Sequence, residues 1–420
     1  MNTVGIVAEY NPFHNGHLYH LEETKKKVNP DAVVAVMSGN FTQRGEPSLL
    51  NKWIRAEIAV RNGIDVVIEL PFVFACNNAE NFAMGAMGIL DGLGCVSHFS
   101  FGSEHGKIEE LIRVTKVLAF EDDEFKEMLK FQLDKGFSFP KARYETIKAL
   151  YGTELANLLL EPNNILAVEY LKQWLQRGSL MKPIIVKRKG SSYHESATSI
   201  RKQMEKEITV REIQSMVPVE TAKVLDRIPG NDRICLNNYY NLLAYKVLTT
   251  DKKSLSQILS VGEGLENKLR KGIIKSRSME DILRFMKTKR YTETRLKRLL
   301  VHTLMGLTKE NYFSIVNDNL LYARVLGISQ KGADLLRYIK KQNCASIPIL
   351  SNINKELSNE DVLWKMLHYD ILASDIYNLL CYGELYNHSD YIIKLYTPPK
   401  EVGDISASLY LTFPALQALS

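Results

Sequence analysis

A short apolar run at the start of the chain, followed at once by a polar turn, is the feature that most limits the possible folds. Residues 4–8 read Val-Gly-Ile-Val-Ala, a pattern typical of a buried strand. An Asn-Pro pair at residues 11–12 ends the run, and residues 18–27 have the composition of a helix. The segment His-Asn-Gly-His at residues 14–17 therefore lies where a strand turns into a helix. Backbone N–H groups and the helix dipole favour an anion such as phosphate there.

The two histidines of this segment are candidate catalytic residues. His14 and His17 can donate hydrogen bonds to phosphate oxygens and offset charge that develops in a transition state. Gly16 lets a ligand approach the backbone closely. Paired histidines are also common as zinc ligands or as ordinary surface residues. Zinc is the less favoured interpretation, because no cysteine or carboxylate lies nearby at ligand spacing.

Apolar, β-branched runs recur through the first half of the chain and alternate with helical patterns. Such runs imply a parallel sheet that is covered by helices on both faces, so the fold class is α/β. Ligands bind such sheets at the carboxyl ends of the strands. The expected strands are residues 4–8, 31–37, 65–70, 96–101 and 183–186.

The rest of the chain is expected to be mostly helical. Residues 108–160 read as consecutive helices and predict a helical insertion into the sheet domain. Beyond residue 207 no further parallel-strand pattern is visible, and helical periodicity dominates to about residue 380. We therefore expect a catalytic domain at residues 1–206 and a mostly α-helical C-terminal domain at residues 207–420.

Composition excludes several classes of protein. The chain has 420 residues, 45% of them hydrophobic and 24% charged, as expected for a globular protein. No apolar run approaches the roughly 18 residues needed to span a membrane, and the start of the chain does not resemble a signal peptide. The five cysteines are far apart and include no C-x-x-C pair. A reduced, cytoplasmic protein is the simplest interpretation.

Positive charge is concentrated in one part of the second half. Residues 251–300 contain 14 Lys or Arg and 6 Asp or Glu, which gives a local net charge of +8 against +6 for the whole chain. Most charge runs are solvated helical faces, but this one is also a candidate footprint for a polyanion such as RNA. The candidate RNA contacts within it are Lys287, Lys289 and Arg290.

The opening segment resembles a known family. His-x-Gly-His after a first strand resembles the nucleotidyltransferase superfamily, which shares its Rossmann-like, HUP-type fold with class I aminoacyl-tRNA synthetases. The longer string at residues 9–17, Glu-Tyr-Asn-Pro-Phe-His-Asn-Gly-His, resembles the bacterial tRNA(Met) cytidine acetate ligase family. The resemblance implies a ligase that uses ATP to convert acetate to acetyl-adenylate, with Mg²⁺ accompanying the nucleotide. The acetyl group would pass to N4 of the wobble cytidine, C34, of elongator tRNA(Met), giving N4-acetylcytidine.

The same resemblance implies which residues bind ATP. His14 and His17 would contact its phosphates, and Gly102 would let adenosine lie close to the backbone. His20 could instead only pack, Asn163 could be a helix cap, and Arg188 could belong to a solvated basic run. Residues 196–201 resemble a second phosphate motif, although an ordinary helix cap is about as good an interpretation. The implied ATP-binding residues are Val7, Ala8, Glu9, Tyr10, Asn11, Pro12, Phe13, His14, Asn15, Gly16, His17, Leu18, Tyr19, His20, Gly102, Asn163, Arg188, Ser199 and Arg201.

Fold logic adds a weaker assignment and leaves two rival functions open. Ser38, Gly39 and Asn40 follow the second expected strand, so they could face acetate or cytosine. A small-molecule nucleotidyltransferase, releasing pyrophosphate from ATP or CTP, is one rival. The other is a non-catalytic RNA-binding protein that retains a nucleotide-binding fold.

Overall fold

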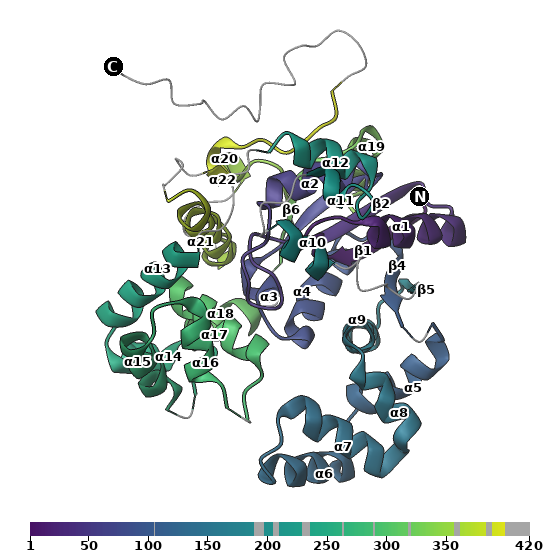
Figure 1. Ribbon diagram of the computed structural model, residues 1–420. Coiled ribbons are helices and arrows are strands. Elements are labelled where there is room, and N and C mark those ends of the chain that lie inside the picture. Colours follow the sequence, from purple (N-terminus) through teal and green to yellow (C-terminus); the bar gives the residue numbers. More distant parts are fainter. Residues whose placement is uncertain are drawn as a thin grey trace, which may run out of the picture.

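The architecture is a seven-stranded, mostly parallel sheet covered by helices on both faces (Figure 1). The computed structural model describes residues 1–104, 106–188, 197–204, 210–228, 236–262, 264–288, 290–317, 321–356, 362–383 and 389–399. The strands are β1 (Thr3–Ala8), β2 (Ala32–Ser38), β3 (Val66–Leu70), β4 (Val96–Ser103), β5 (Lys182–Lys187), β6 (Ala323–Ile328) and β7 (Ile349–Leu350). They lie in the order β5-β4-β1-β2-β3-β6-β7.

The five strands expected from the sequence form the parallel part of this sheet. β1 lies at its centre and pairs in parallel with β2 and β4, while β3 and β5 extend the two sides. The carboxyl ends of these five strands therefore meet at one edge. The prediction of an α/β fold with a parallel sheet is confirmed.

Burial on both faces explains why β2 is apolar throughout. Val33, Ala35 and Met37 join one hydrophobic cluster, whereas Val34 and Val36 join the other. On the first face lie α1 (Asn15–Val28), α2 (Lys52–Arg61) and α12 (Val219–Asp226). On the second lie α4 (Ala79–Gly92), α9 (Pro162–Arg177) and α19 (Gln330–Gln342). A strand that is covered on both sides needs apolar residues at every position rather than at alternate ones.

The helical insertion leaves the sheet after β4 and returns through α9 to β5. It comprises α5 (Ile108–Ala119), α6 (Asp123–Asp134), α7 (Phe139–Tyr151), α8 (Thr153–Asn157) and a 3₁₀ turn at Leu158–Leu160. Gly136 and Gly152 follow α6 and α7 with positive φ angles of 82° and 93°, conformations that glycine tolerates best. The predicted insertion is confirmed. It projects from the sheet at the bottom of Figure 1.

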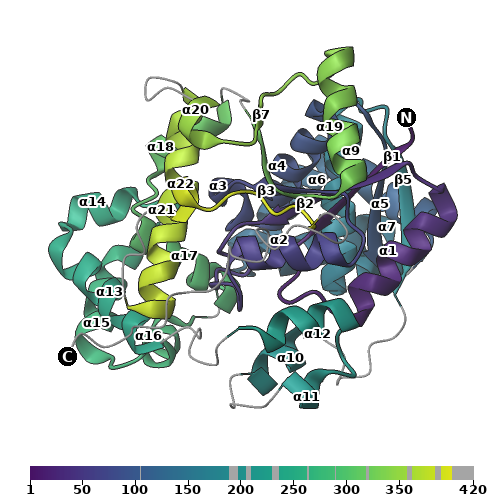
Figure 2. The same ribbon diagram turned by 90° about the horizontal axis from the view of Figure 1, so that it is seen from above.

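The helices of residues 236–317 and 362–382 form a separate group that lies away from α1 in Figure 2, whereas α12 covers the same face of the sheet as α1. The group is built around α13 and α17, and α21 packs on the short helix α3 (Phe72–Ala75). The remaining helices are α10 (Ala197–Met204), α11 (Val210–Ile213), α13 (Leu236–Thr249), α14 (Lys252–Gln257), α15 (Leu265–Lys275), α16 (Met279–Met286), α17 (Glu293–Met305), α18 (Lys309–Asn317), α20 (Ile353–Glu356), α21 (Val362–Tyr382) and α22 (Ser389–Ile392). No helix in the described ranges is long and apolar enough to cross a membrane.

Two strands were missed by the sequence analysis. β6 pairs antiparallel with β3, and β7 pairs in parallel with β6, so the second half of the chain extends the sheet. A search for parallel strands overlooks β6 because Arg324 and Gly327 interrupt its apolar pattern. Near the end of the described chain, Tyr396 adds a single parallel bridge to Gly327 of β6. The boundary near residue 206 stays a prediction.

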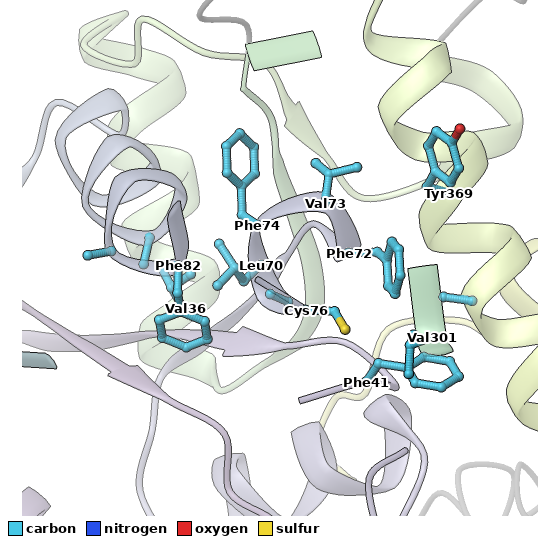
Figure 3. Close-up of a cluster of buried hydrophobic side chains, with 14 of the residues drawn as sticks. Val36, Phe41, Leu70, Phe72, Val73, Phe74, Cys76, Phe82, Val301 and Tyr369 are labelled. Carbon is cyan, nitrogen blue, oxygen red and sulfur yellow. The ribbon is translucent and has the colours of Figure 1, made fainter. Parts of the chain in front are cut away.

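One hydrophobic cluster joins the two halves (Figure 3). The ring of Phe72, after β3, lies between side chains from the loop after β2 and from a helix of the second half. Its centroid is 5.9 Å from that of Phe41 and 6.5 Å from that of Tyr369 on α21. Val301 of α17 belongs to the same cluster, next to Phe41 in Figure 3. The C-terminal helices therefore complete the core under the loops that follow β2 and β3.

Four buried charges connect the same halves. Lys52 Nζ lies 2.8 Å from Glu69 Oε1 and 2.7 Å from Asp390 Oδ2. Arg324 Nη1 lies 3.2 Å from Glu69 Oε2 and 2.9 Å from Asp390 Oδ2. All four side chains are at most 2% exposed. Burial alone would raise the pKa of Asp390, but Arg324 and Lys52 outweigh it and hold that pKa below its ordinary value.

A further buried acid lies beside this ionic quartet. Asp370 of α21 accepts hydrogen bonds from the Phe72 N–H at 2.6 Å and from the Tyr322 hydroxyl. Burial, with added repulsion from Glu69, raises the pKa of Asp370 to about 7. The carboxyl group of Asp370 therefore connects α21 to the end of β3 by hydrogen bonds. Because its pKa is raised, it needs a counter-charge less than an ordinary carboxylate does.

We predict that Asp390→Asn destabilises the whole protein. The substitution leaves two buried cations facing one carboxylate, and breaking a buried pair in this way costs roughly 3–5 kcal/mol. Urea unfolding would measure the change in free energy of unfolding. Asp123→Asn is the matched control, because the Asp123–Lys126 pair is exposed and should contribute below about 1 kcal/mol. Equal stability of the two variants would contradict the prediction.

Candidate active site

The turn between β1 and α1 is a helix cap built from the two histidines. The Gly16 N–H donates to Nδ1 of His14 at 3.0 Å, and the His14 N–H donates to Nδ1 of His17 at 3.2 Å. The ring centroids lie 3.9 Å apart. Because both Nδ1 atoms accept, each neutral ring must carry its proton on Nε2. The cap therefore leaves two Nε2–H donors for a ligand.

Gly16 is required for this cap. A Cβ added at residue 16 would lie 2.8 Å from Cε1 of His14 and 3.0 Å from its Nδ1. Any other residue would push the His14 ring out of position. Gly16 therefore leaves room for the His14 ring, in addition to the close approach of a ligand that the sequence predicts.

The histidines at this turn are held neutral. Burial, with added repulsion from Arg188 and Arg201, lowers the pKa of His14 from 6.5 to about 4. Burial also lowers the pKa of His17 well below its ordinary value and that of His20 to about 4. At neutral pH these rings are polar donors in a site whose positive charge comes from arginines.

Aromatic rings and one strained residue fix His17. Its ring centroid lies 5.0 Å from that of Tyr10, edge-on, and 5.5 Å from that of Phe13. Tyr10 is buried and has a φ angle of 46°, in the left-handed region that non-glycine residues rarely adopt. Such outliers concentrate at functional sites. His20 points elsewhere: its Nε2 lies 3.0 Å from the Ser100 hydroxyl on β4.

A fully buried arginine shapes the loops around the turn. Arg55 of α2 donates from Nη1 to the Glu9 carbonyl at 2.6 Å, from Nε to the Leu50 carbonyl at 3.0 Å, and from Nη2 to the Gly39 carbonyl. It thereby fixes the chain after β1 relative to the chain after β2. Arg55 could not be singled out from the sequence, because one arginine in an amphipathic helix looks like any surface residue.

α10 brings a second group of predicted residues to the turn. Arg201 Nη1 donates to the Asn11 carbonyl at 2.9 Å and Nη2 to the Thr198 hydroxyl at 3.3 Å. Ser199 lies in the first turn of the same helix. Residue 196, the start of the predicted phosphate motif, is outside the described ranges. The guanidinium nevertheless places a positive charge beside the histidine cap.

The ends of β4 and β5 bring three further predicted residues together. Gly102 pairs with Val186, and a Cβ there would lie 3.4 Å from Cγ of Arg188. Asn163, at the start of α9, donates through its amide to Oε1 of Glu104, and Arg188 Nε lies 3.8 Å from the same oxygen. Within the described residues, Glu104 Oε2 is buried and has no hydrogen-bond partner. Glu104 was not singled out from the sequence, where it reads as one more polar residue after a strand.

The residues after β2 that could face acetate or cytosine lie inside the protein. Ser38, Gly39 and Asn40 are all buried. The Asn40 amide donates to the Ser374 hydroxyl at 3.2 Å, and its oxygen accepts from the Lys52 N–H at 2.7 Å. Both polar groups of the Asn40 side chain are therefore hydrogen-bonded within the protein. The Ser38 hydroxyl is buried and has no hydrogen-bond partner among the described residues.

The basic C-terminal segment reaches the site through α17. Lys297 Nζ lies 2.6 Å from Glu46 Oε1, and Arg298 Nη1 donates to the Gln43 carbonyl at 3.0 Å. Both partners belong to the loop after β2. Lys287 and Arg290 are exposed between α16 and α17, and Lys289 lies outside the described ranges.

The fold and the site define a nucleotidyltransferase-type protein, with a helix cap of the His-x-Gly-His type at the carboxyl edge of a parallel sheet. The model of the HIGH Nucleotidyl Transferase family matches residues 1–390. The tRNA(Met) cytidine acetate ligase of Thermoanaerobacter pseudethanolicus is 40% identical, over 90% of this chain and 95% of that protein. That of Caldicellulosiruptor saccharolyticus is 41% identical, over 96% of this chain and all of the relative.

A solved structure agrees with these relatives. Thermotoga maritima TmcAL bound with alpha-thio ATP has a TM-score of 0.88 and 34% identity, covering 95% of this chain and 100% of that one. The chain belongs to the HIGH nucleotidyl transferases and, within them, to the tRNA(Met) cytidine acetate ligase family.

We predict that the pKa of His14 responds to ATP. In the free protein the ring should titrate near its lowered pKa of about 4, and a bound triphosphate should raise that pKa because opposite charge favours the protonated ring. NMR titration of the histidine rings would measure it. His302, which burial also holds at a pKa of about 4 but which lies on α17, is the control. An unchanged His14 pKa in saturating ATP would contradict phosphate binding at the cap.

Proposed function

We propose that this protein is an ATP-dependent ligase that acetylates N4 of the wobble cytidine, C34, of elongator tRNA(Met). Acetate and ATP would first give acetyl-adenylate and pyrophosphate. The observation that carries the proposal is the histidine cap at the end of β1, with both Nε2–H donors free of the cap and Arg201 beside it. The named relatives and the neighbour that binds an ATP analogue support the same reaction.

The first step needs positioning more than covalent chemistry. A carboxylate oxygen of acetate attacks the α-phosphorus of ATP, and the bond from that phosphorus to the bridging oxygen of pyrophosphate breaks. Neutral donors at His14 and His17, with Arg201 and Arg188, would stabilise the charge that moves onto the phosphate oxygens. Mg²⁺ is proposed to enter with the triphosphate, through phosphate oxygens. Within the described residues, no three His, Cys, Asp or Glu side chains gather as a metal site.

The second step transfers the acetyl group. Cytidine N4 attacks the acetyl carbonyl carbon, the carbon–oxygen bond to AMP breaks, and N4 loses a proton. The mixed anhydride is needed because the exocyclic amine is a weak nucleophile and free acetate has no good leaving group. Ser38, Gly39 and Asn40 remain the proposed surroundings of acetate or cytosine, with Asn40 acting through the loop it holds.

Two parts of the chain would divide this work. Residues 1–206 would bind ATP, and residues 207–420 would hold the tRNA through the basic segment that includes Lys287, Lys289 and Arg290. The contact of α17 with the loop after β2 supports this division, because it brings the basic helices to the edge of the nucleotide site.

We predict that His14→Asn lowers turnover by about 10²–10³-fold, the loss typical of one charge-stabilising donor. Asparagine is a good N-cap, so its side-chain oxygen can still accept from the Gly16 N–H while the Nε2 donor is lost. Acetate-dependent pyrophosphate exchange into ATP measures the first step. Mass spectrometry of tRNA nucleosides after incubation with labelled acetate measures the product.

The matched control is His98→Asn, a histidine near the amino end of β4. It should leave both rates within about twofold of the wild type. Wild-type activity in a well-folded His14→Asn protein would remove the catalytic assignment. Pyrophosphate exchange into ATP that requires a phosphorylated metabolite instead of acetate would favour a small-molecule nucleotidyltransferase. Tight tRNA binding without any ATP turnover would favour a non-catalytic RNA-binding protein.

We further propose that Glu104 binds the adenosine part of ATP, through a hydroxyl or amino hydrogen bond to its unpaired Oε2. Hydrogen bonds to charged groups contribute roughly 1.5–3 kcal/mol. Glu104→Gln should therefore raise the KM for ATP by about 10–100-fold and change kcat little. Glu109→Gln, at an exposed position of α5, is the control. A fall in kcat with an unchanged KM would contradict this role.

A further inference from the structure

The turn between α6 and α7 carries exposed aromatic rings with cations stacked on them. Phe131 and Phe139 are 53% and 52% exposed. Lys135 Nζ lies 4.0 Å from the centroid of the Phe131 ring, and Lys141 Nζ lies 4.3 Å from that of Phe137. Exposed apolar side chains that lie close together, here at the end of α6 and the start of α7, mark an interaction site more often than single ones do.

The charges of this turn are largely unneutralised. Residues 130–148 contain five basic and two acidic side chains, a local net charge of +3. Arg143 is paired with Glu169 at 2.7 Å and is mostly buried. In the described part of the chain, Lys130, Lys135 and Lys141 make no ion pair. These three lysines are available to an anionic partner.

The insertion is joined directly to the proposed nucleotide site. The chain leaves that site at Glu104, passes through α5 to α8, and returns to it at Asn163. α5 has 12 residues and is therefore about 18 Å long, and α6 and α7 lie beyond it at the far end of the insertion (Figure 1). The basic helices α14 to α17 project on the same side of the sheet in that view. A long polyanion with one nucleotide in the site can meet both.

We propose that the α6–α7 turn is a second RNA-binding surface, on which unpaired bases of the tRNA stack on Phe131 and Phe139 while phosphates contact Lys135 and Lys141. The proposal rests on the tRNA substrate proposed above. Alternating aromatic rings and cations are the chemistry by which proteins bind single-stranded nucleic acid without reading its sequence. Charge complementarity favours RNA over a second copy of this chain, because the same turn in that copy would also be positive.

The experiment separates stacking from charge. Phe131→Ser combined with Phe139→Ser should raise the Kd for a tRNA(Met) transcript by roughly 5–100-fold for each stacked base lost, without changing the salt dependence. Lys135→Gln and Lys141→Gln should instead each reduce the log–log salt slope by roughly 0.7. Fluorescence anisotropy at several salt concentrations measures both quantities. Leu180→Ser, at a position that is 95% exposed before β5, is the control for removing an exposed apolar side chain and should change neither.

The RNA-binding surface and the proposed acetylation reaction are tested by different outcomes. Affinity that the serine variants leave unchanged, with unfolding midpoints like the wild type, would overturn the RNA surface. So would loss of a dimer in sedimentation without loss of tRNA affinity, because a second copy would then be the occupant. A fully paired RNA stem that binds as tightly as tRNA and loses affinity equally in the serine variants would overturn stacking. Absence of acetate-dependent pyrophosphate exchange in the wild type would remove the proposed reaction, while direct RNA binding still tests this surface.

Discussion

The buried quartet of Lys52, Glu69, Arg324 and Asp390 is the interaction on which the arrangement of the two halves depends. Lys52 lies on α2 and Glu69 on β3, whereas the other two members come from the last third of the chain. Buried ions are tolerated only when each has its counter-charge. The C-terminal chain therefore cannot leave the sheet without exposing or orphaning charge. An apolar contact alone would allow sliding, whereas the quartet fixes one register of β6 beside β3.

The proposed nucleotide site uses the opposite arrangement of charge. Its histidines are neutral and are held by backbone hydrogen bonds, and its positive charge is placed on arginines. Such a site keeps the same donors over a wide range around neutrality. A polyanionic nucleotide then meets fixed dipoles and fixed charges, which need little reorganisation during the reaction.

The elements that could be predicted are those determined by residues close together in the sequence. The first strand, the turn with His14 and the insertion between β4 and β5 follow from periodicity and from turn residues close in the chain, and the structure contains them. β6 was missed because it is a strand only through its pairing with β3, and the partners of Arg324 are far away in sequence. Arg55 and Glu104 were missed for the same reason. Their significance lies in carbonyls, or in an unpaired oxygen, that only the folded chain brings together.

Gly39 is the point at which the two charge systems meet. Its carbonyl accepts from Arg55, which also holds the chain after β1, and a Cβ on Gly39 would lie 2.6 Å from Oε1 of Glu69 in the quartet. Only glycine allows the carboxylate and the guanidinium to approach the same short segment from two sides. The attachment of the C-terminal half and the shape of the proposed nucleotide site are therefore linked through one backbone position. A change in the packing of the C-terminal helices against Glu69 would therefore also shift the segment after β2 that Arg55 holds.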